Sequence, residues 1–260
     1  MTIDLEPRCG LPVHVDIKSG DLRFGHPLST PAITERRMWD MAPVWAHPFE
    51  AEDKVLYQFT VPLSLPGDEE LWNQAGVGYG IVVCPPGVYG GEYAKSFGHY
   101  HPRPAGSSMA PPEIYTVLHG TAHYVLQKSA PPYDSVSDAV LVEVNAGETV
   151  IIPPDYGHLQ INPANCPLVF SYAVMTGIKS DYEPFRQRRG AVYYEMANGG
   201  PRFVFNPRYS RPIPLRFVKA AELAQAPFLK CGVTYLGLRD QLDKLRFLTN
   251  PELFPDSAYL

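Results

Sequence analysis

Three histidines and one glutamate stand at spacings that suit a metal site. His99 and His101 lie two apart in GHYH, and residues two apart on a β-strand point to one face of it. Glu113 opens the apolar run EIYTVLHG, and His158 follows a proline-rich turn. Together these side chains can reach one divalent ion and leave coordination positions open for a substrate.

The ligand types narrow the choice of metal without naming one. Three imidazoles and one carboxylate suit Fe²⁺, Mn²⁺, Ni²⁺, Co²⁺ or Zn²⁺. We expect one divalent transition metal per subunit, with Fe²⁺ favoured. A lone H-x-H pair often binds no metal, so the prediction depends on all four residues. Such a set can hold Fe²⁺ for the O₂ chemistry of a dioxygenase, or it can belong to a sugar-binding protein without catalysis.

The elements that must position these residues are mainly strands. The chain of 260 residues holds 28 prolines and 21 glycines, which disfavours a helical bundle. Apolar runs recur about every 8–12 residues from Gly76 onward, which is typical of an all-β sandwich or barrel. The predicted strands are 55–64, 78–87, 113–120, 121–128, 139–147, 148–154, 159–165, 167–175, 191–196 and 202–206.

A few short helices are predicted around the strands. Ser29 and Thr30 can cap a helix over 31–42. The spacing of leucine and valine predicts helices over 217–225 and 238–248. Because no linker precedes the tail, we expect residues 211–260 to form a helical extension packed on a barrel domain of residues 1–210.

Both histidine blocks resemble the motifs of the cupin superfamily. The second block fits the spacing G-x5-P-x4-H-x3-N, from Gly147 to Asn162. In the first block, eleven residues separate His101 from Glu113, which is a longer spacing than common cupins have. That spacing and the run PPGVYGGEYAKSFGHYH resemble the cupin-type glucose-6-phosphate isomerases of archaea and some bacteria. Asp181-Tyr182 and NPRYS downstream, and VDIKSGDL (15–22) upstream, extend the resemblance over roughly residues 13–210.

The resemblance implies a cupin jelly-roll β-barrel that interconverts glucose 6-phosphate and fructose 6-phosphate. It implies that the four ligands hold the metal and that Glu113 is the catalytic residue that moves a proton between C1 and C2. A hydride shift, in which Glu113 is only a ligand, stays open. The implied substrate and phosphate contacts are Ser96, Gly98, Tyr115, Tyr172 and Tyr182.

The remaining basic residues receive less specific predictions. Lys95 or Arg103 could add a positive charge for the phosphate, although a solvated surface charge is the favoured interpretation of both. His119 and His123 are expected at the surface or at a strand edge.

The composition and the motifs also give predictions about binding partners and cellular location. A net charge of −5 gives no general attraction to nucleic acid or to anionic membranes. No apolar run reaches 18 residues and no signal peptide is visible, so we expect a cytoplasmic protein. The four cysteines form no C-x-x-C pair and are expected as free thiols. The predicted partners are a phosphosugar substrate and a second copy of the chain, because the resembling family is dimeric.

Overall fold

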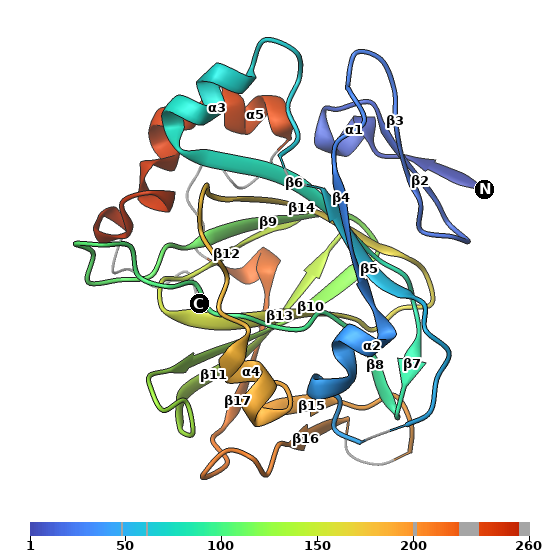
Figure 1. Cartoon of the computed structure of the whole chain (residues 1–260), viewed down its shortest axis with the longest axis vertical. Helices are drawn as coiled ribbons and strands as arrows, with labels where there is room; N and C mark the ends of the chain where they lie inside the picture. The colour runs from blue at the N-terminus through green and yellow to red at the C-terminus, as the bar shows by residue number, and fades with distance from the viewer. Residues whose placement is uncertain (48, 61, 200–201, 224–233, 255–260) are drawn as a thin grey trace.

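Two six-stranded sheets make up most of the fold (Figure 1). The computed structural model describes all residues except 48, 61, 200–201, 224–233 and 255–260. The first sheet contains, in spatial order, β17 (Leu215–Lys219), β11 (Val136–Asn145), β10 (Thr121–Ser129), β13 (Tyr156–Asn162), β8 (Glu92–Lys95) and β7 (Val88–Tyr89). The second contains β12 (Thr149–Ile152), β9 (Glu113–His119), β14 (Leu168–Met175), β6 (Val77–Cys84), β5 (Val55–Thr60) and β4 (Ile33–Arg37).

The chain crosses repeatedly between the two sheets. Strand β9 belongs to the second sheet, β10 and β11 to the first, β12 to the second, β13 to the first and β14 to the second. This alternation is the connectivity of a jelly roll, and it confirms the predicted all-β fold with short flanking helices. Within the described residues neither sheet closes on itself, so the interior lies between two sheets.

Smaller elements cover the outer faces. A three-stranded sheet at the N-terminus and a two-stranded hairpin accompany short helices. These elements are β1 (Thr2–Asp4), β2 (Val13–Asp16), β3 (Leu22–Phe24), β15 (Tyr193–Glu195), β16 (Phe203–Phe205), α1 (Glu6–Cys9), α2 (Met38–Met41), α3 (Glu69–Ala75), α4 (Glu183–Arg188) and α5 (Tyr235–Arg239). The 3₁₀ turns are η1 (Ala42–Val44), η2 (Ala220–Glu222), η4 (Leu242–Leu248) and η5 (Pro251–Leu253). Every helix in the described residues is too short or too polar to cross a bilayer.

The central strands of the second sheet are buried on both faces. One face lines the interior, where Tyr115 and Phe170 pack against Tyr124 of the first sheet. The other face packs under the N-terminal sheet and the tail, and all eight residues of β6 are buried in consequence. Helices α3 and α5 lie together there (Figure 1), joined by a 2.8 Å hydrogen bond from the Trp72 indole to the Tyr235 hydroxyl.

The ten predicted strands are confirmed, but two predicted helices are wrong. Residues 33–37 form edge strand β4, and the helix is limited to Met38–Met41, with a 3₁₀ turn at Ala42–Val44 after it. The β-branched Ile33 and Thr34 suit pairing with β5, and this pairing outweighs the helix-capping signal before them. Residues 215–219 form β17, parallel to β11, with one 3₁₀ turn after it.

The tail therefore contributes a strand as well as helical turns. The predicted helix over 238–248 is divided, since α5 ends at Arg239 and a 3₁₀ helix covers Leu242–Leu248. Buried residues of both turns join the core beneath the second sheet. The domain division at residue 210 stays a prediction. Cys9, Cys84 and Cys166 are free thiols as predicted, and Cys231 lies outside the described residues.

Candidate metal centre

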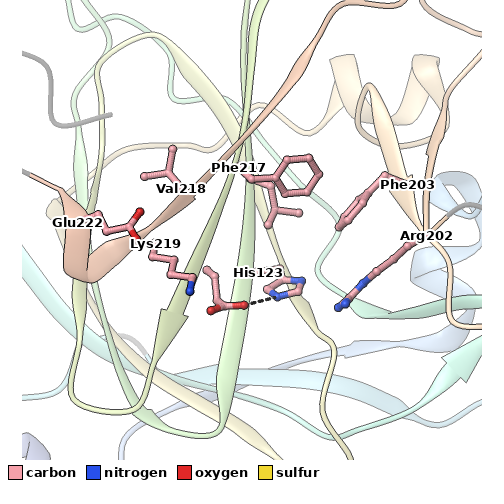
Figure 2. Close-up of a pocket in the computed structure, with 9 residues that line it drawn as sticks. His123, Arg202, Phe203, Phe217, Val218, Lys219 and Glu222 are labelled. Carbon is pink, nitrogen blue, oxygen red and sulfur yellow. Dashed lines mark ion pairs between the residues drawn. The ribbon is translucent and has the colours of Figure 1, made fainter.

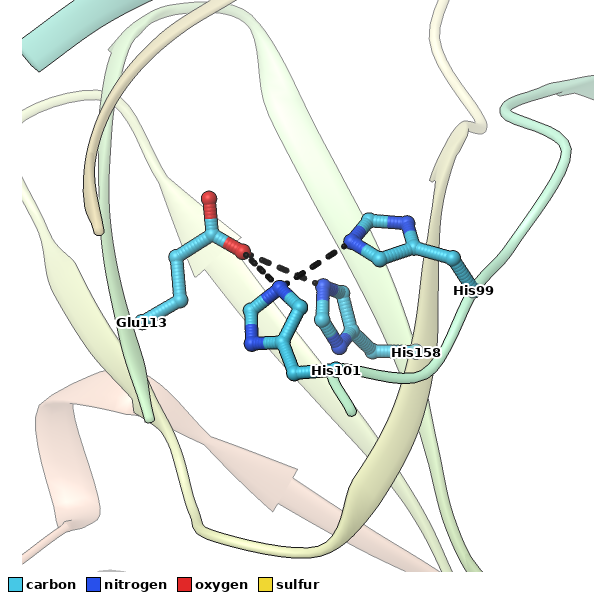
Figure 3. Close-up of side chains that lie close together, drawn as sticks. All are labelled: His99, His101, Glu113 and His158. Carbon is cyan, nitrogen blue, oxygen red and sulfur yellow. Dashed lines mark hydrogen bonds and ion pairs between the residues drawn. The ribbon is translucent and has the colours of Figure 1, made fainter. Parts of the chain in front are cut away.

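His99, His101, Glu113 and His158, here called the metal-ligand cluster, converge inside the sandwich (Figure 3). Their ligand atoms all lie within 4.8 Å of one another. The Nε2 atoms of His99 and His101 are 3.2 Å apart. Glu113 Oε2 lies 3.4 Å from His101 Nε2 and 3.3 Å from His158 Nε2. One ion at their centre can therefore be reached by all four side chains.

The two sheets share the task of positioning the cluster. His99 and His158 form an antiparallel bridge, with backbone N–H to O distances of 3.1 and 3.0 Å in the two directions. The segment after β8 thereby places two histidines beside β13 of the first sheet. Glu113 begins β9 in the second sheet. The site thus spans the interior and depends on the packing of both sheets.

The outer nitrogens of two imidazoles are held by backbone carbonyls. His101 Nδ1 lies 2.9 Å from the Pro111 carbonyl, and His158 Nδ1 lies 3.3 Å from the Tyr156 carbonyl. A carbonyl only accepts hydrogen bonds, so this geometry assigns the proton to Nδ1. The Nε2 lone pairs then face the centre, as a metal requires of neutral imidazole.

Burial and mutual charge set the protonation of the cluster. Burial lowers the pKa of His99 well below its ordinary value, and the neighbouring His158 and His101 lower it further. Burial alone would raise the pKa of Glu113, but the adjacent His101 and His158 hold that pKa well below its ordinary value. Burial alone would lower the pKa of His101, but Glu113 raises it. A neutral imidazole and an ionised carboxylate are the forms that bind a divalent cation, and the low pKa values of His99 and Glu113 favour these forms.

Two predicted substrate contacts on β9 and β14 have their hydroxyls engaged in the protein. The Tyr115 hydroxyl donates to Glu113 Oε2 at 2.8 Å and lies 3.0 Å from His158 Nε2. Tyr172 faces Tyr115 in the strand register, and its hydroxyl donates to the Thr60 carbonyl at 2.6 Å. Tyr115 is thus placed to orient Glu113, and a phosphate role for either tyrosine stays a prediction.

The other three predicted contacts lie in loop segments, outside the strands and helices. The Ser96 hydroxyl is buried and accepts the Gln160 N–H at 3.2 Å. Gly98 has φ +82°, and a Cβ there would meet the Phe185 ring at 2.5 Å, so backbone and packing both require glycine. The Tyr182 ring lies 5.5 Å from the rings of Phe97 and His99. Their contacts with substrate stay predictions.

Of the two candidate phosphate cations, only Arg103 is the expected surface charge. Its side chain is 58% exposed and pairs with Asp155. The prediction for Lys95 is wrong, because its side chain is 3% exposed, pairs with Glu92 and donates to the Val44 carbonyl at 2.8 Å. The adjoining Val44 segment and Tyr194 cover it, which the local sequence does not indicate. Lys95 is therefore committed to the fold.

The surface prediction is also wrong for His123. Its side chain is 6% exposed, and its Nδ1 lies 2.8 Å from Glu195. Its Nε2 lies 3.6 Å from Glu143, and a dashed line marks this ion pair in Figure 2. The hairpin that carries Glu195 and Arg202 covers this face of the first sheet. His119 is half-buried at the end of β9, where its Nδ1 lies 2.8 Å from the Pro167 carbonyl.

Comparison with known proteins places the chain in a family. The family model described as glucose-6-phosphate isomerase matches residues 35–210, which include the whole metal-ligand cluster. The chain belongs to the glucose-6-phosphate isomerase family. The glucose-6-phosphate isomerase of Pyrococcus horikoshii is 25% identical over 205 residues, covering 76% of this chain and 96% of that protein. That of Thermococcus gammatolerans is 26% identical over 161 residues, covering 62% and 79%.

Solved structures show weaker overall similarity. The formate complex of Lactobacillus farciminis oxalate decarboxylase matches with a TM-score of 0.36 at 22% identity. The match covers 64% of this chain and 36% of that chain.

Proposed function

We propose that the protein is a metal-dependent aldose–ketose isomerase that interconverts glucose 6-phosphate and fructose 6-phosphate. Family membership supports this reaction, as do the names of the similar archaeal proteins. The observation that carries the proposal is the convergence of three imidazoles and one carboxylate from both sheets, inside the region that the family model matches.

The reaction moves hydrogen between C1 and C2 of an open-chain sugar. A divalent ion held by the cluster would polarise the sugar carbonyl and its neighbouring hydroxyl. Glu113 directs Oε2 toward His101 and His158, while Figure 3 shows its second oxygen pointing away from the imidazoles. That second oxygen is available to accept a proton from one carbon and return it to the other. The Tyr115 hydroxyl fixes the carboxylate in this orientation.

The low pKa of Glu113 bears on the choice of route. It keeps the carboxylate ionised and able to accept a proton, but it also makes Glu113 a weaker base. A hydride shift between C1 and C2 needs no base, and in that route Glu113 would serve only as a ligand. Replacement of Glu113 by glutamine, considered in the Discussion, distinguishes the two routes.

Further parts of the proposal concern metal, assembly and setting. We propose Fe²⁺ as the metal and a homodimer as the assembly, in a cytoplasmic enzyme of glycolysis or gluconeogenesis. Edge strand β17 and its 61% exposed Phe217 support a further contact surface. Metal analysis of the purified protein and light scattering test these two points, and a monomer would contradict the second.

A coupled assay tests the isomerase directly. Purified protein receives fructose 6-phosphate, and the glucose 6-phosphate formed is measured with and without a chelator. We expect turnover that the chelator abolishes and that a divalent metal restores. The assay is repeated without oxygen, because a dioxygenase consumes O₂ and an isomerase does not. Activity that depends on oxygen would contradict the proposal. So would a lack of isomerase activity with every metal tested.

A further inference from the structure

Arg36 is a cation at the edge of the metal-ligand cluster. It lies on β4, opposite Tyr57 of β5. Its guanidinium carbon lies 5.1 Å from the centre of the Tyr182 ring, and the same ring lies 5.5 Å from that of His99. One aromatic ring therefore contacts both the guanidinium and a predicted metal ligand.

The hydrogen bonding of Arg36 is incomplete. Its Nε is buried and has no hydrogen-bond acceptor among the described residues. No carboxylate of the described residues forms an ion pair with Arg36. The adjacent Arg37 contrasts with it, because its Nε donates to Asp53 at 2.7 Å and its Nη1 to Glu35 at 3.3 Å. The Tyr57 and Tyr182 hydroxyls accept hydrogen bonds from other guanidinium nitrogens of Arg36, so only the Nε–H is unsatisfied. A buried donor without an acceptor is unfavourable, and a bound anion would supply the acceptor that this Nε–H lacks.

Other cations near the site do not offer the same group. Lys95 is paired with Glu92, and Arg103 with Asp155. Nε atoms of Arg188 and Arg189 are also buried without an acceptor. These two residues lie at the C-terminal end of α4, where the Arg188 guanidinium donates to the carbonyls of Pro132 and Arg208. Arg36 differs from them because it lies against the ring that also contacts His99.

We propose that the Arg36 guanidinium binds the phosphate group of the substrate, an inference that rests on the proposed isomerase function. The planar guanidinium offers donors in a fork that matches two phosphate oxygens, with the unpaired Nε–H as one of them. The carbonyl end of the sugar lies at the metal-ligand cluster, and the phosphate lies at the far end of the carbon chain. Holding the phosphate fixes the reacting carbons beside Glu113.

Kinetics of two neighbouring variants test the assignment. In Arg36→Gln we expect the KM for fructose 6-phosphate to rise by about 10- to 100-fold, the effect of losing a charged hydrogen bond. We expect kcat to change less and metal content to stay unchanged. Inorganic phosphate should inhibit the wild type competitively, and its inhibition constant should rise in parallel with KM. The matched control Arg37→Gln removes the same charge one residue away and should leave both constants unchanged.

The outcomes separate this inference from the function on which it rests. An unchanged KM and unchanged phosphate inhibition in folded Arg36→Gln overturn it, as does an equal loss in Arg37→Gln. If Arg36→Gln does not fold, lack of competitive inhibition of the wild type by phosphate overturns it. If the wild type does not isomerise phosphosugars, the proposed function fails by itself. Calorimetry with inorganic phosphate then decides the anion site: binding lost in Arg36→Gln supports it, and equal binding in both proteins overturns it.

Discussion

Two buried groups of histidine and glutamate lie on opposite faces of the same sheet. The metal-ligand cluster faces the interior, where His158 of β13 stands opposite Leu126 of β10. His123 lies three residues before Leu126 on β10 and therefore points to the other face. There it joins Glu195 and Arg202 in what we call the outer ion-pair cluster. Each group contains buried histidine and glutamate, but the contacts of these residues differ.

The two clusters differ in whether the protein itself supplies a positive charge for the glutamate. In the outer ion-pair cluster, Glu195 accepts from His123 Nδ1 at 2.8 Å and from Arg202 at 2.6 Å, so the chain neutralises its own carboxylate. In the metal-ligand cluster, imidazole lone pairs and a carboxylate oxygen converge on one point. Burial of histidine and glutamate is therefore not enough to indicate a metal site, whereas convergence of acceptor atoms is.

The largest expected difference between the two clusters is in the metal content of two histidine variants. His158→Ala removes one of four ligands and should lower metal affinity by more than about 100-fold, since loss of only a supporting partner costs 10- to 100-fold. Isomerase activity should fall with it. The matched variant His123→Ala changes a buried histidine on the opposite face and should retain full metal content. Metal analysis after dialysis measures both, and equal metal loss would remove the distinction between the clusters.

Glu113→Gln asks whether the carboxylate does more than bind metal. If Glu113 transfers the proton, turnover should fall about 10²-fold or more while KM changes little. Metal content is the control, because the amide oxygen can still coordinate an ion. Near-normal turnover with metal bound would exclude Glu113 as the base and favour the hydride shift.

Local spacing predicted the metal-ligand cluster but could not predict its surroundings. His99 and His101 are close because of the two-residue period of a strand, which the sequence contains. The burial of His123 and Lys95 depends on segments that lie 51 or more residues away along the chain, namely those of Glu195 and Val44. No local pattern reports such coverage. The sequence does not single out Arg36, because residues 31–42 have helix-start signals, whereas pairing with β5 makes the segment around Arg36 a strand.

The outer ion-pair cluster should be a stability device. Glu195→Gln leaves His123 and Arg202 without the carboxylate that they share, and the side chain of Glu195 is fully buried. We expect a loss of about 1–3 kcal/mol in the free energy of unfolding, as for other unsatisfied buried polar groups. Metal content and KM should not change. Thermal unfolding measures the effect, with Glu183→Gln as control because Glu183 pairs with Arg186 on the exposed surface. A variant as stable as the wild type would show that the outer cluster is dispensable.

An exposed ion pair on the same sheet offers the smallest effect. Asp138 on β11 pairs with Arg216 on β17 at 2.8 Å, but 27% and 44% of their side chains are exposed. Burial would raise the pKa of Asp138, but hydrogen bonds from Arg216 and Tyr156 hold it below its ordinary value. The pair therefore stabilises the fold above the unfolded-state pKa of about 3.9, and this contribution is lost as pH falls through the folded-state value.

Asp138→Asn should therefore lower the free energy of unfolding by at most about 1 kcal/mol at pH 7, because solvent screens an exposed pair. The difference from the wild type should shrink in high salt, and it should disappear as the pH falls through the lowered folded-state pKa of Asp138. Denaturant unfolding at several pH values measures this, with the exposed Asp243→Asn as control. A difference that persists in acid would mean that Asp138 acts through packing of β17 and not through charge. Packing of side chains would then stabilise the outer face of the sheet, whereas the metal-ligand cluster depends on charge.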